Sequence, residues 1–263
     1  MDRLAFTREV GPAIHRCELT HLAPDPIDLD RARAQHAGYE ACLRALGCAV
    51  RRLPPEPDHP DAVFVEDTAV VTEELAILTR PGAASRRGEV ASMAEALAPF
   101  RPCARIEPPG TLDGGDVLVL GRHVHVGLSS RSNADGIAQL RRLLEPHGYA
   151  VHTAFFTGCL HLKSAVTQVG PETLLLNPAW VDREPFREHR ALAVDPEEPF
   201  GANALLIGTS VIYPSEHPRT AERLVVAGID VRSVEASELA KAEGGVTCCC
   251  VLVGTSSSTS MGA

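Results

Sequence analysis

DVLVLGRHVHVG, at residues 116–127, is the stretch that decides how the rest of the chain is interpreted. Apolar residues recur on both sides of a glycine-containing turn, which is the pattern of a β-hairpin. A helix is predicted after it, from about Asn133 to Glu145, because apolar residues recur there at i, i+3 and i+7. Asn133 suits the N-cap position, and Gly148 lies beyond the predicted end. The stretch therefore predicts a hairpin followed by a helix.

Similar hairpins recur along the chain at a spacing of roughly 40–50 residues, which is typical of repeat or propeller architectures. They are predicted at residues 69–79, 165–176 and 204–213. Helices are predicted after the first and the last of these, over residues 87–98 and 218–227. The recurring unit thus combines a hairpin with a helix in several places.

A fifth unit begins at Gly244 and Gly245 and continues as VTCCCVLV, which supplies one strong strand. The N-terminal segment 4–8 is the natural partner of that strand. Five units predict an α/β fold, a five-bladed α/β propeller with pseudo-five-fold repeats, which the shared N-terminal strand closes. An ordinary α/β sandwich with several hairpins is the alternative that patterning leaves open. Residues 1–254 are predicted to form this single domain, and the small polar residues 255–263 a flexible tail.

The composition is that of a globular protein with an acidic surface. The chain has 263 residues, of which 44% are hydrophobic and 4% aromatic, so aliphatic packing must form the core. Its formal net charge of −9 disfavours nucleic acid as a partner and mildly favours a cationic ligand.

The sequence also indicates the compartment. It contains no apolar run of about 18 residues, so no membrane span is expected, and its N-terminus lacks the apolar region of a signal peptide. The eight cysteines are scattered or adjacent, which is a poor disulfide framework for a chain of this length. We therefore expect reduced cysteines and a cytoplasmic protein.

Cys248 is the first candidate for chemistry. Gly244 and Gly245 precede it and would let the backbone approach a ligand closely, and a cysteine thiolate is a strong nucleophile. A buried cysteine in a strand is the alternative interpretation. In a strand, Cys248 and Cys250 would share one face and Cys249 would occupy the other.

Carboxylates stand at the entrances of the first two hairpins. Glu66 and Asp67 precede the first, and Asp113 and Asp116 precede the second. A planar guanidinium is bound by carboxylates aimed at its N–H edges, and equivalent edges of neighbouring units converge on a propeller axis. Turn chemistry is the alternative explanation of the Asp-Gly pairs.

Basic residues occupy similar positions. His161 precedes the third hairpin, where it could serve as general acid and base, or it could be a packed or surface histidine. Arg86, Arg87 and Arg131 follow hairpins and could clamp a carboxylate, although most arginines are solvated at the surface. Pairs such as His123 with His125 lack the partner cluster of a structural zinc site, and no nucleotide-binding motif occurs, so no metal or cofactor is expected.

Several motifs recur in a defined order from about Leu19 to Val253. They are DAVFVED (61–67), LTRPGAASRRGE (78–89), LDGGDVLVLG (112–121), VGLSSRSNADG (126–136), HLKS (161–164), GANALL (201–206), YPSEHPRT (213–220) and EGGVTCC (243–249). In their joint order and spacing the chain resembles the dimethylarginine dimethylaminohydrolases of the guanidine-modifying pentein superfamily. That resemblance implies a five-bladed propeller, in agreement with the repeats.

The resemblance also implies the roles of individual residues. Cys248 would be the nucleophile, His161 the acid and base, and Asp113 the carboxylate beside it. The implied substrate pocket contains Leu19, Asp61, Phe64, Glu66, Asp67, Arg86, Arg131 and Ala242. In it, Asp67 with Asp113 would hold the guanidinium, Asp61 the α-amino group, and Arg86 with Arg131 the α-carboxylate, while Leu19 would belong to a lid.

The implied activity is hydrolysis of N-ω-methylated arginine to citrulline and an amine, through a covalent thiouronium on Cys248. The expected partner is a small-molecule substrate, without nucleic acid or membrane, and the chain is expected to be a monomer or homodimer. Arginine deiminase is the nearest alternative, although deiminases have an acidic residue at the position of Lys163. A hydrolase of citrulline or another modified guanidine, an amidinotransferase and a non-catalytic pentein are the others. Glu243 stands where relatives usually have aspartate, and some relatives have glutamate in place of Asp113.

Overall fold

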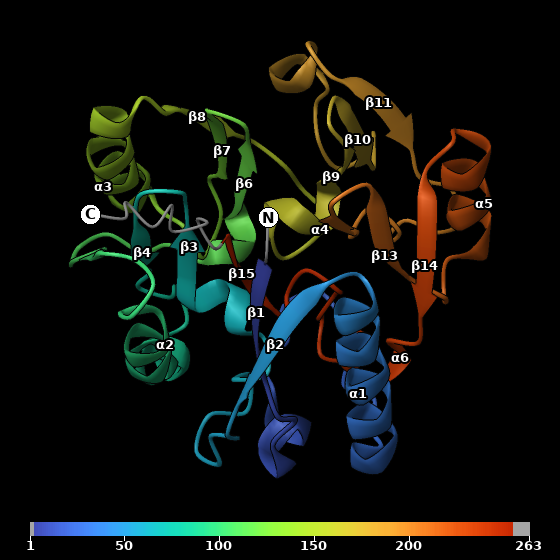
Figure 1. Cartoon of the computed structure of the whole chain (residues 1–263), viewed down its shortest axis with the longest axis horizontal. Coiled ribbons are helices and arrows are strands. Elements are labelled where there is room, and N and C mark those ends of the chain that lie inside the picture. The colour runs from blue at the N-terminus through green and yellow to red at the C-terminus, as the bar shows by residue number, and fades with distance from the viewer. Residues whose placement is uncertain (1–2, 255–263) are drawn as a thin grey trace, which may run out of the picture.

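Five three-stranded sheets surround a central axis in the computed structural model, which describes residues 3–254 (Figure 1). In sheet order they are β15-β1-β2, β3-β4-β5, β6-β7-β8, β9-β10-β11 and β12-β13-β14. The strands are β1 (Arg3–Arg8), β2 (Cys48–Leu53), β3 (Ala69–Val71), β4 (Ala76–Leu78), β5 (Cys103–Arg105), β6 (Val117–Leu120), β7 (His123–Gly127), β8 (Ala150–Ala154), β9 (Val166–Gly170), β10 (Thr173–Leu176), β11 (Arg190–Ala193), β12 (Leu205–Ile207), β13 (Ser210–Pro214), β14 (Asp230–Val234) and β15 (Val251–Gly254). The fold is the predicted α/β propeller. The predicted tail, 255–263, lies outside the described residues.

Each sheet follows one plan, an antiparallel pair joined by a third, parallel strand. A parallel strand requires a crossover, and a helix provides it in four sheets: α1 (Leu29–Ala45), α2 (Val90–Leu97), α3 (Ala134–Leu144) and α5 (Pro218–Val226). In the remaining sheet the crossover contains the short 3-10 helix η6 (Glu184–Phe186). The other short helices are η1 (Pro12–Arg16), η2 (Val65–Thr68), η3 (Ala84–Glu89), η4 (Gly114–Asp116), η5 (Glu145–His147), α4 (Leu162–Ala165) and α6 (Ser237–Ala240).

The ends of the described chain meet in one sheet, as the sequence predicts. β15 pairs antiparallel with β1, from Arg3 opposite Gly254 to Phe6 opposite Val251. Thus the first sheet takes its inner strand from the far end of the chain, which closes the ring of sheets.

The helix predicted after residues 116–127 is confirmed as α3. The side chain of Asn133 caps it by accepting the backbone N–H of Gly136 at 2.8 Å. Gly148 adopts a φ of 81°, the left-handed conformation that glycine tolerates and that turns the chain toward β8.

One predicted strand is wrong over the cysteines. Residues 246–249 form a turn, and β15 begins only at Val251. The N–H of Cys248 is bonded to the carbonyl of Gly245 at 3.2 Å, and the N–H of Cys250 to that of Thr247 at 3.4 Å. Because these bonds are local and not inter-strand, the alternation expected for Cys248, Cys249 and Cys250 does not apply.

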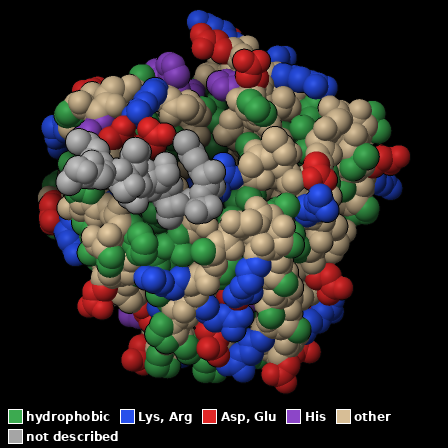
Figure 2. Space-filling model, viewed as in Figure 1, with side chains coloured by type: hydrophobic (Ala, Val, Ile, Leu, Met, Phe, Trp, Pro, Cys, Tyr) green, Lys and Arg blue, Asp and Glu red, His purple; other side chains and the backbone are tan. Residues whose placement is uncertain are grey.

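The core is built from aliphatic side chains, as the scarcity of aromatic residues requires. Between the second and third sheets it contains Ile77, Leu112, Val124, Ile137 and Leu140. The described cysteines are all free of disulfides. No helix within residues 3–254 has the length and apolar character needed to cross a membrane. Basic and acidic side chains are interspersed on the face shown in Figure 2.

The inner strands line an axial cavity of about 230 Å³. β3, β6, β9, β12 and β15 each contribute lining residues, so all five sheets take part. Glu66, Lys163 and Thr247 also line it. These residues belong to the loops and short helices that precede the inner strands, and the same segments carry the predicted site residues.

Acid is expected to destabilise the third sheet through His125. The ring of His125 is buried beside Phe186, with a centroid distance of 4.6 Å, and near His152. Burial, followed by the neighbouring imidazoles, lowers the pKa of His125 to about 4. An unfolded histidine binds a proton near pH 6.5, so the unfolded state binds more protons between about pH 6.5 and pH 4. This group therefore reduces the free energy of unfolding as the pH falls, by about 2 kcal/mol at pH 5.

Urea denaturation at about pH 7.5 and pH 5 checks this expectation. His125→Phe should lose less stability on acidification than the wild type, while the exposed control His15→Ala should match the wild type. His36 is also buried with a pKa lowered to about 4, so part of the acid sensitivity remains in the variant. Parallel losses in His125→Phe and the wild type would contradict the assignment.

Candidate active site

Most of the predicted site residues meet around one small cavity of about 20 Å³. A volume of this size holds about one water molecule. The cavity is lined by the predicted residues Asp61, Phe64, Asp67, Arg86, Arg131, His161, Ala242 and Cys248, together with Glu18, Leu160, Glu243 and Gly244. Leu19, Glu66 and Asp113 do not line it.

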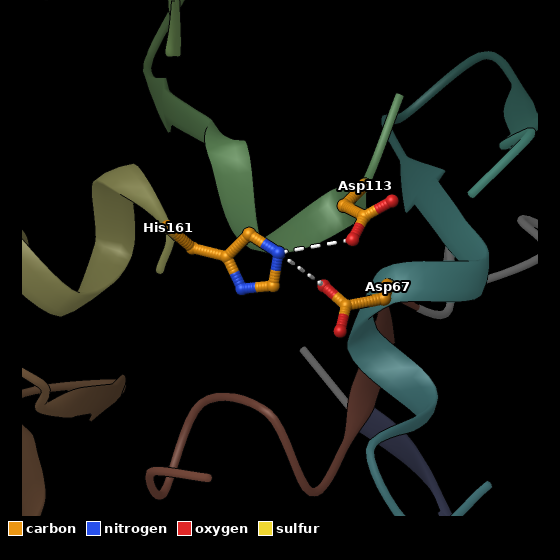
Figure 3. A group of neighbouring side chains, drawn as sticks. All are labelled: Asp67, Asp113 and His161. Atoms are coloured by element: carbon orange, nitrogen blue, oxygen red, sulfur yellow. Dashed lines mark hydrogen bonds and ion pairs between the residues drawn. The ribbon is translucent and has the colours of Figure 1, made fainter. Parts of the chain in front are cut away.

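His161 lies between two carboxylates (Figure 3). Its Nε2 is 3.0 Å from Oδ2 of Asp113 and 3.8 Å from Oδ1 of Asp67. Residue 161 precedes α4, and Asp116 fixes that point by accepting the N–H of Leu162 at 3.0 Å. Because Nε2 faces both carboxylates, Nδ1 is the nitrogen left for proton transfer.

The charges of this cluster stabilise an imidazolium. Burial alone would lower the pKa of His161, but the carboxylates of Asp67, Asp113 and Asp116 outweigh it and raise that pKa to about 9. Burial would raise the pKa of Asp67, but His161 and Arg86 outweigh it and lower that pKa to about 2. At neutral pH, His161 is therefore protonated and Asp67 ionised.

Cys248 lies on the 246–249 turn, and its Sγ accepts the N–H of Gly245 at 3.3 Å. Burial, with the nearby carboxylates of Glu66 and Asp67, raises the pKa of the Cys248 thiol well above its usual range. The resting site therefore pairs a neutral thiol with an imidazolium. A cation placed beside the sulfur would lower the thiol pKa and favour the thiolate.

The two predicted arginines differ in how much of the guanidinium is free. Arg86 is bound by Glu89 at 2.8 Å, by Asp67 at 2.5 Å and by the backbone carbonyls of Asp61 and Phe64. Most of its N–H donors are thus used within the protein. Glu89, the last residue of η3 and three positions after Arg86, accepts several of them. The prediction that Arg86 clamps a carboxylate is therefore revised, since the side chain mainly orients Asp67.

Arg131 has weaker partners. Its nearest contacts are Oγ1 of Thr20 at 3.4 Å and Oδ2 of Asp113 at 3.9 Å. Of the two predicted arginines, Arg131 is the one with donors left for a ligand.

Glu66 does not line the small cavity, and its place in the substrate pocket stays a prediction. Lys163 Nζ lies 2.5 Å from its Oε1, and Thr247 Oγ1 donates to its Oε2 at 2.8 Å. These partners turn the carboxylate toward the axial cavity. The same pairing offsets the charge of Lys163.

The other predicted positions fall near the cavity with different partners. The Asp113 carboxylate binds His161 and accepts the N–H of Gly82 at 2.9 Å, so it orients the imidazole. The Asp61 carboxylate accepts the N–H of Glu18 at 3.2 Å. Leu19 is half-buried in the next position of that loop.

Two further residues, without a role predicted from the sequence, shape the site. The N–H of Gly115 donates to Oδ1 of Asp67 at 2.9 Å, and a Cβ there would lie 2.7 Å from Nδ1 of His161. Glu89 neutralises Arg86. The Gly-Gly pair of LDGGD was the available signal for the first, and the second ends the motif LTRPGAASRRGE.

The described residues contain one group with the spacing to hold a metal ion, formed by Asp67, Asp113 and His161, whose ligand atoms lie within 4.8 Å of one another. A metal ligand must be deprotonated, and the pKa of His161 is raised to about 9. A metal would therefore have to displace the proton that the two carboxylates stabilise.

Comparison with known proteins matches this chain to a family. Residues 23–196 match the family model described as "N,N dimethylarginine dimethylhydrolase, eukaryotic". The N(G),N(G)-dimethylarginine dimethylaminohydrolase of Streptomyces coelicolor is 39% identical over 94% of this chain and 95% of its own length. That of Pseudomonas aeruginosa is 37% identical over 84% of this chain and 88% of its own length.

A solved structure agrees over nearly the whole length. A cysteine-to-serine variant of the Pseudomonas aeruginosa enzyme, in complex with citrulline, superposes with a TM-score of 0.91 at 33% identity. The superposition covers 95% of this chain and 98% of that one. The chain therefore belongs to the dimethylarginine dimethylaminohydrolase family.

Proposed function

We propose that the chain hydrolyses N-ω-methylated arginine to citrulline, releasing dimethylamine or methylamine, with Cys248 as the nucleophile. The observation that carries this proposal is a buried thiol and a carboxylate-held imidazolium on the walls of one cavity. A nucleophile and a general acid in one buried site suit the displacement of an amine from carbon. The relatives named above, one of them crystallised with citrulline, support the substrate class.

The first half of the reaction forms a covalent intermediate. The cationic guanidinium enters beside Cys248 and lowers the thiol pKa, so the thiol releases its proton to solvent and the thiolate attacks the central guanidinium carbon. The C–N bond to the methylated nitrogen then breaks as His161 transfers its proton from Nδ1 to the departing amine. A thiouronium remains on Cys248.

The second half restores the enzyme. His161, now neutral, removes a proton from water, which attacks the same carbon. The C–S bond breaks as the proton of the added hydroxyl passes to the departing sulfur, citrulline leaves, and the Cys248 thiol and the His161 imidazolium are restored. Asp113 stabilises the imidazolium each time it forms, and the overall reaction consumes one water for each amine released.

We also propose binding groups among the residues that line the same cavity. Asp67 is ionised and borders the cavity, which suits the guanidinium. Asp61, which lines the same cavity as Ala242, suits the α-amino group, while Arg131 suits the α-carboxylate. Arg86 supports the site by fixing Asp67. The acidic net charge favours the encounter with a cation.

Lys163 distinguishes this proposal from arginine deiminase. Deiminases have an acidic residue at this position, whereas Lys163 has an ammonium that is paired with Glu66 outside the small cavity. The HLK segment therefore brings no second carboxylate to a guanidinium in that cavity. We also propose that residues 1–254 form one domain that acts on this small molecule without nucleic acid. The sharing of one axial cavity by all five sheets supports that single unit.

Parallel incubations with asymmetric dimethylarginine, monomethylarginine, arginine and citrulline test the function. Citrulline, ornithine and the released amines are quantified in each. Citrulline with dimethylamine or methylamine from the methylated substrates, and little from arginine, is the expected result. Equal or faster turnover of arginine would indicate deiminase activity. Formation of ornithine from citrulline would mean that citrulline, and not methylated arginine, is the substrate.

A further inference from the structure

A carboxylate from near the C-terminus holds a loop from near the N-terminus. Oε1 of Glu243 accepts the backbone N–H groups of Thr20, His21 and Leu22 at 2.9, 2.5 and 2.7 Å. Successive N–H groups that converge on one oxygen form an anion-binding concavity. Each bond is assisted by the charge of the carboxylate.

The same loop is tethered at a second point. The N–H of Glu18 donates to the Asp61 carboxylate, and Oγ of Ser85 donates to Oε1 of Glu18 at 2.6 Å. Leu19 lies between the two tethers. Asp61 and Glu243 both line the small cavity, so the loop is fastened to two of its walls.

The backbone conformation of Glu243, which holds the loop, is unusual. With a φ of 57°, it is the single non-glycine residue with positive φ within residues 3–254. Such a backbone persists where surrounding interactions hold it. Oε2 is buried and has no hydrogen-bond partner among the described residues, so the loop amides are the groups that bind this carboxylate.

The closed loop leaves too little room for a substrate. The cavity beside Cys248 measures about 20 Å³, enough for about one water molecule and far less than an amino acid requires. Glu243 also lines a neighbouring cavity of about 220 Å³, together with His21 and Leu22 of the loop. Glu243 therefore borders both the small cavity and a larger space, and a substrate needs more room beside Cys248 than the present position of the loop leaves.

We infer that Glu243 is a latch, a positioning residue whose carboxylate closes the 18–22 loop over the substrate after entry. The expected effect on kinetics rests on the proposed function, whereas the closure of the loop rests on the contacts above. Breaking the latch shifts the loop toward open forms, which weakens substrate retention more than it slows bond breaking at Cys248.

Two measurements without substrate test the latch itself. In Glu243→Gln and Glu243→Ala, the amides of residues 20–22 should exchange with deuterium at least about tenfold faster than in the wild type. Alkylation of Cys248 by iodoacetamide, followed by peptide mapping, should accelerate as well. Glu222→Gln removes an exposed carboxylate of α5 and should leave both rates unchanged. Glu243→Asp keeps the charge and should restore part of the protection.

Steady-state kinetics with asymmetric dimethylarginine supply the third readout. KM should rise by about tenfold or more in Glu243→Gln, with a smaller change in kcat. Unchanged amide exchange and unchanged Cys248 alkylation in Glu243→Ala would overturn the latch. If the wild type turned over no methylated arginine, the proposed function would fail, while the exchange and alkylation rates would still decide the latch.

Discussion

Cys248→Ser is expected to lose at least roughly 10⁴-fold in turnover of asymmetric dimethylarginine. The sulfur is the atom that forms the covalent bond, and a serine hydroxyl is a far weaker nucleophile. His161 does not compensate, because its proton is held by carboxylates and it enters the cycle as an acid. Initial rates of citrulline formation over a range of substrate concentrations measure the loss.

The neighbouring cysteines are the matched controls. Cys249 directs its thiol to the carbonyl of Gly245 at 3.5 Å, and Cys250 lines the axial cavity, so neither faces the enclosed site. Cys249→Ser and Cys250→Ser should keep kcat within a few-fold of the wild type, with some loss of stability because both side chains are buried. If either control abolished turnover while Cys248→Ser remained active, a different cysteine would be the nucleophile.

His161→Asn is expected to reduce kcat by about 10²- to 10⁴-fold, the usual contribution of a general acid and base. The loss should be smaller for an arginine analogue that releases a thiolate, because that leaving group departs without a proton. Comparing kcat for the two substrates isolates the protonation step. His147→Asn, at an exposed position, serves as the control.

The pH dependence offers a second check on His161. Its raised pKa of about 9 means that the acid form is present at neutral pH and is lost as the pH rises through that value. The rate of the first half-reaction should therefore fall above about pH 9 in the wild type.

A loss in His161→Asn that was equal for both leaving groups would contradict the role of His161 as the acid.

The hairpins could be predicted from the sequence, but helix α1 and the third, outer strands of the sheets could not. The buried face of α1 includes Gln35, His36 and Glu40, so apolar periodicity does not reveal this helix. The third strands carry many exposed side chains, as in β2, and therefore resemble loops in composition. Recognising them requires the parallel pairing that only the assembled sheet supplies.

Long-range contacts also explain the features of the site that the sequence does not reveal. The cysteine segment reads as a strand, yet Asn203 from another unit binds the N–H of Thr247 at 3.1 Å and fixes a turn. Charge pairing determines the orientation of Glu66, which Lys163 holds away from the small cavity. The types and order of the catalytic candidates were visible in the sequence, whereas the partner of each charge depended on the fold.

The most direct test of the central claim is the location of the covalent intermediate. The enzyme is quenched with acid during turnover of asymmetric dimethylarginine, digested, and examined by peptide mass spectrometry. The proposed mechanism predicts an adduct on Cys248 that retains the substrate except for dimethylamine and that disappears when the substrate is exhausted. Continued turnover without any adduct on Cys248, or an adduct on a different residue, would contradict it.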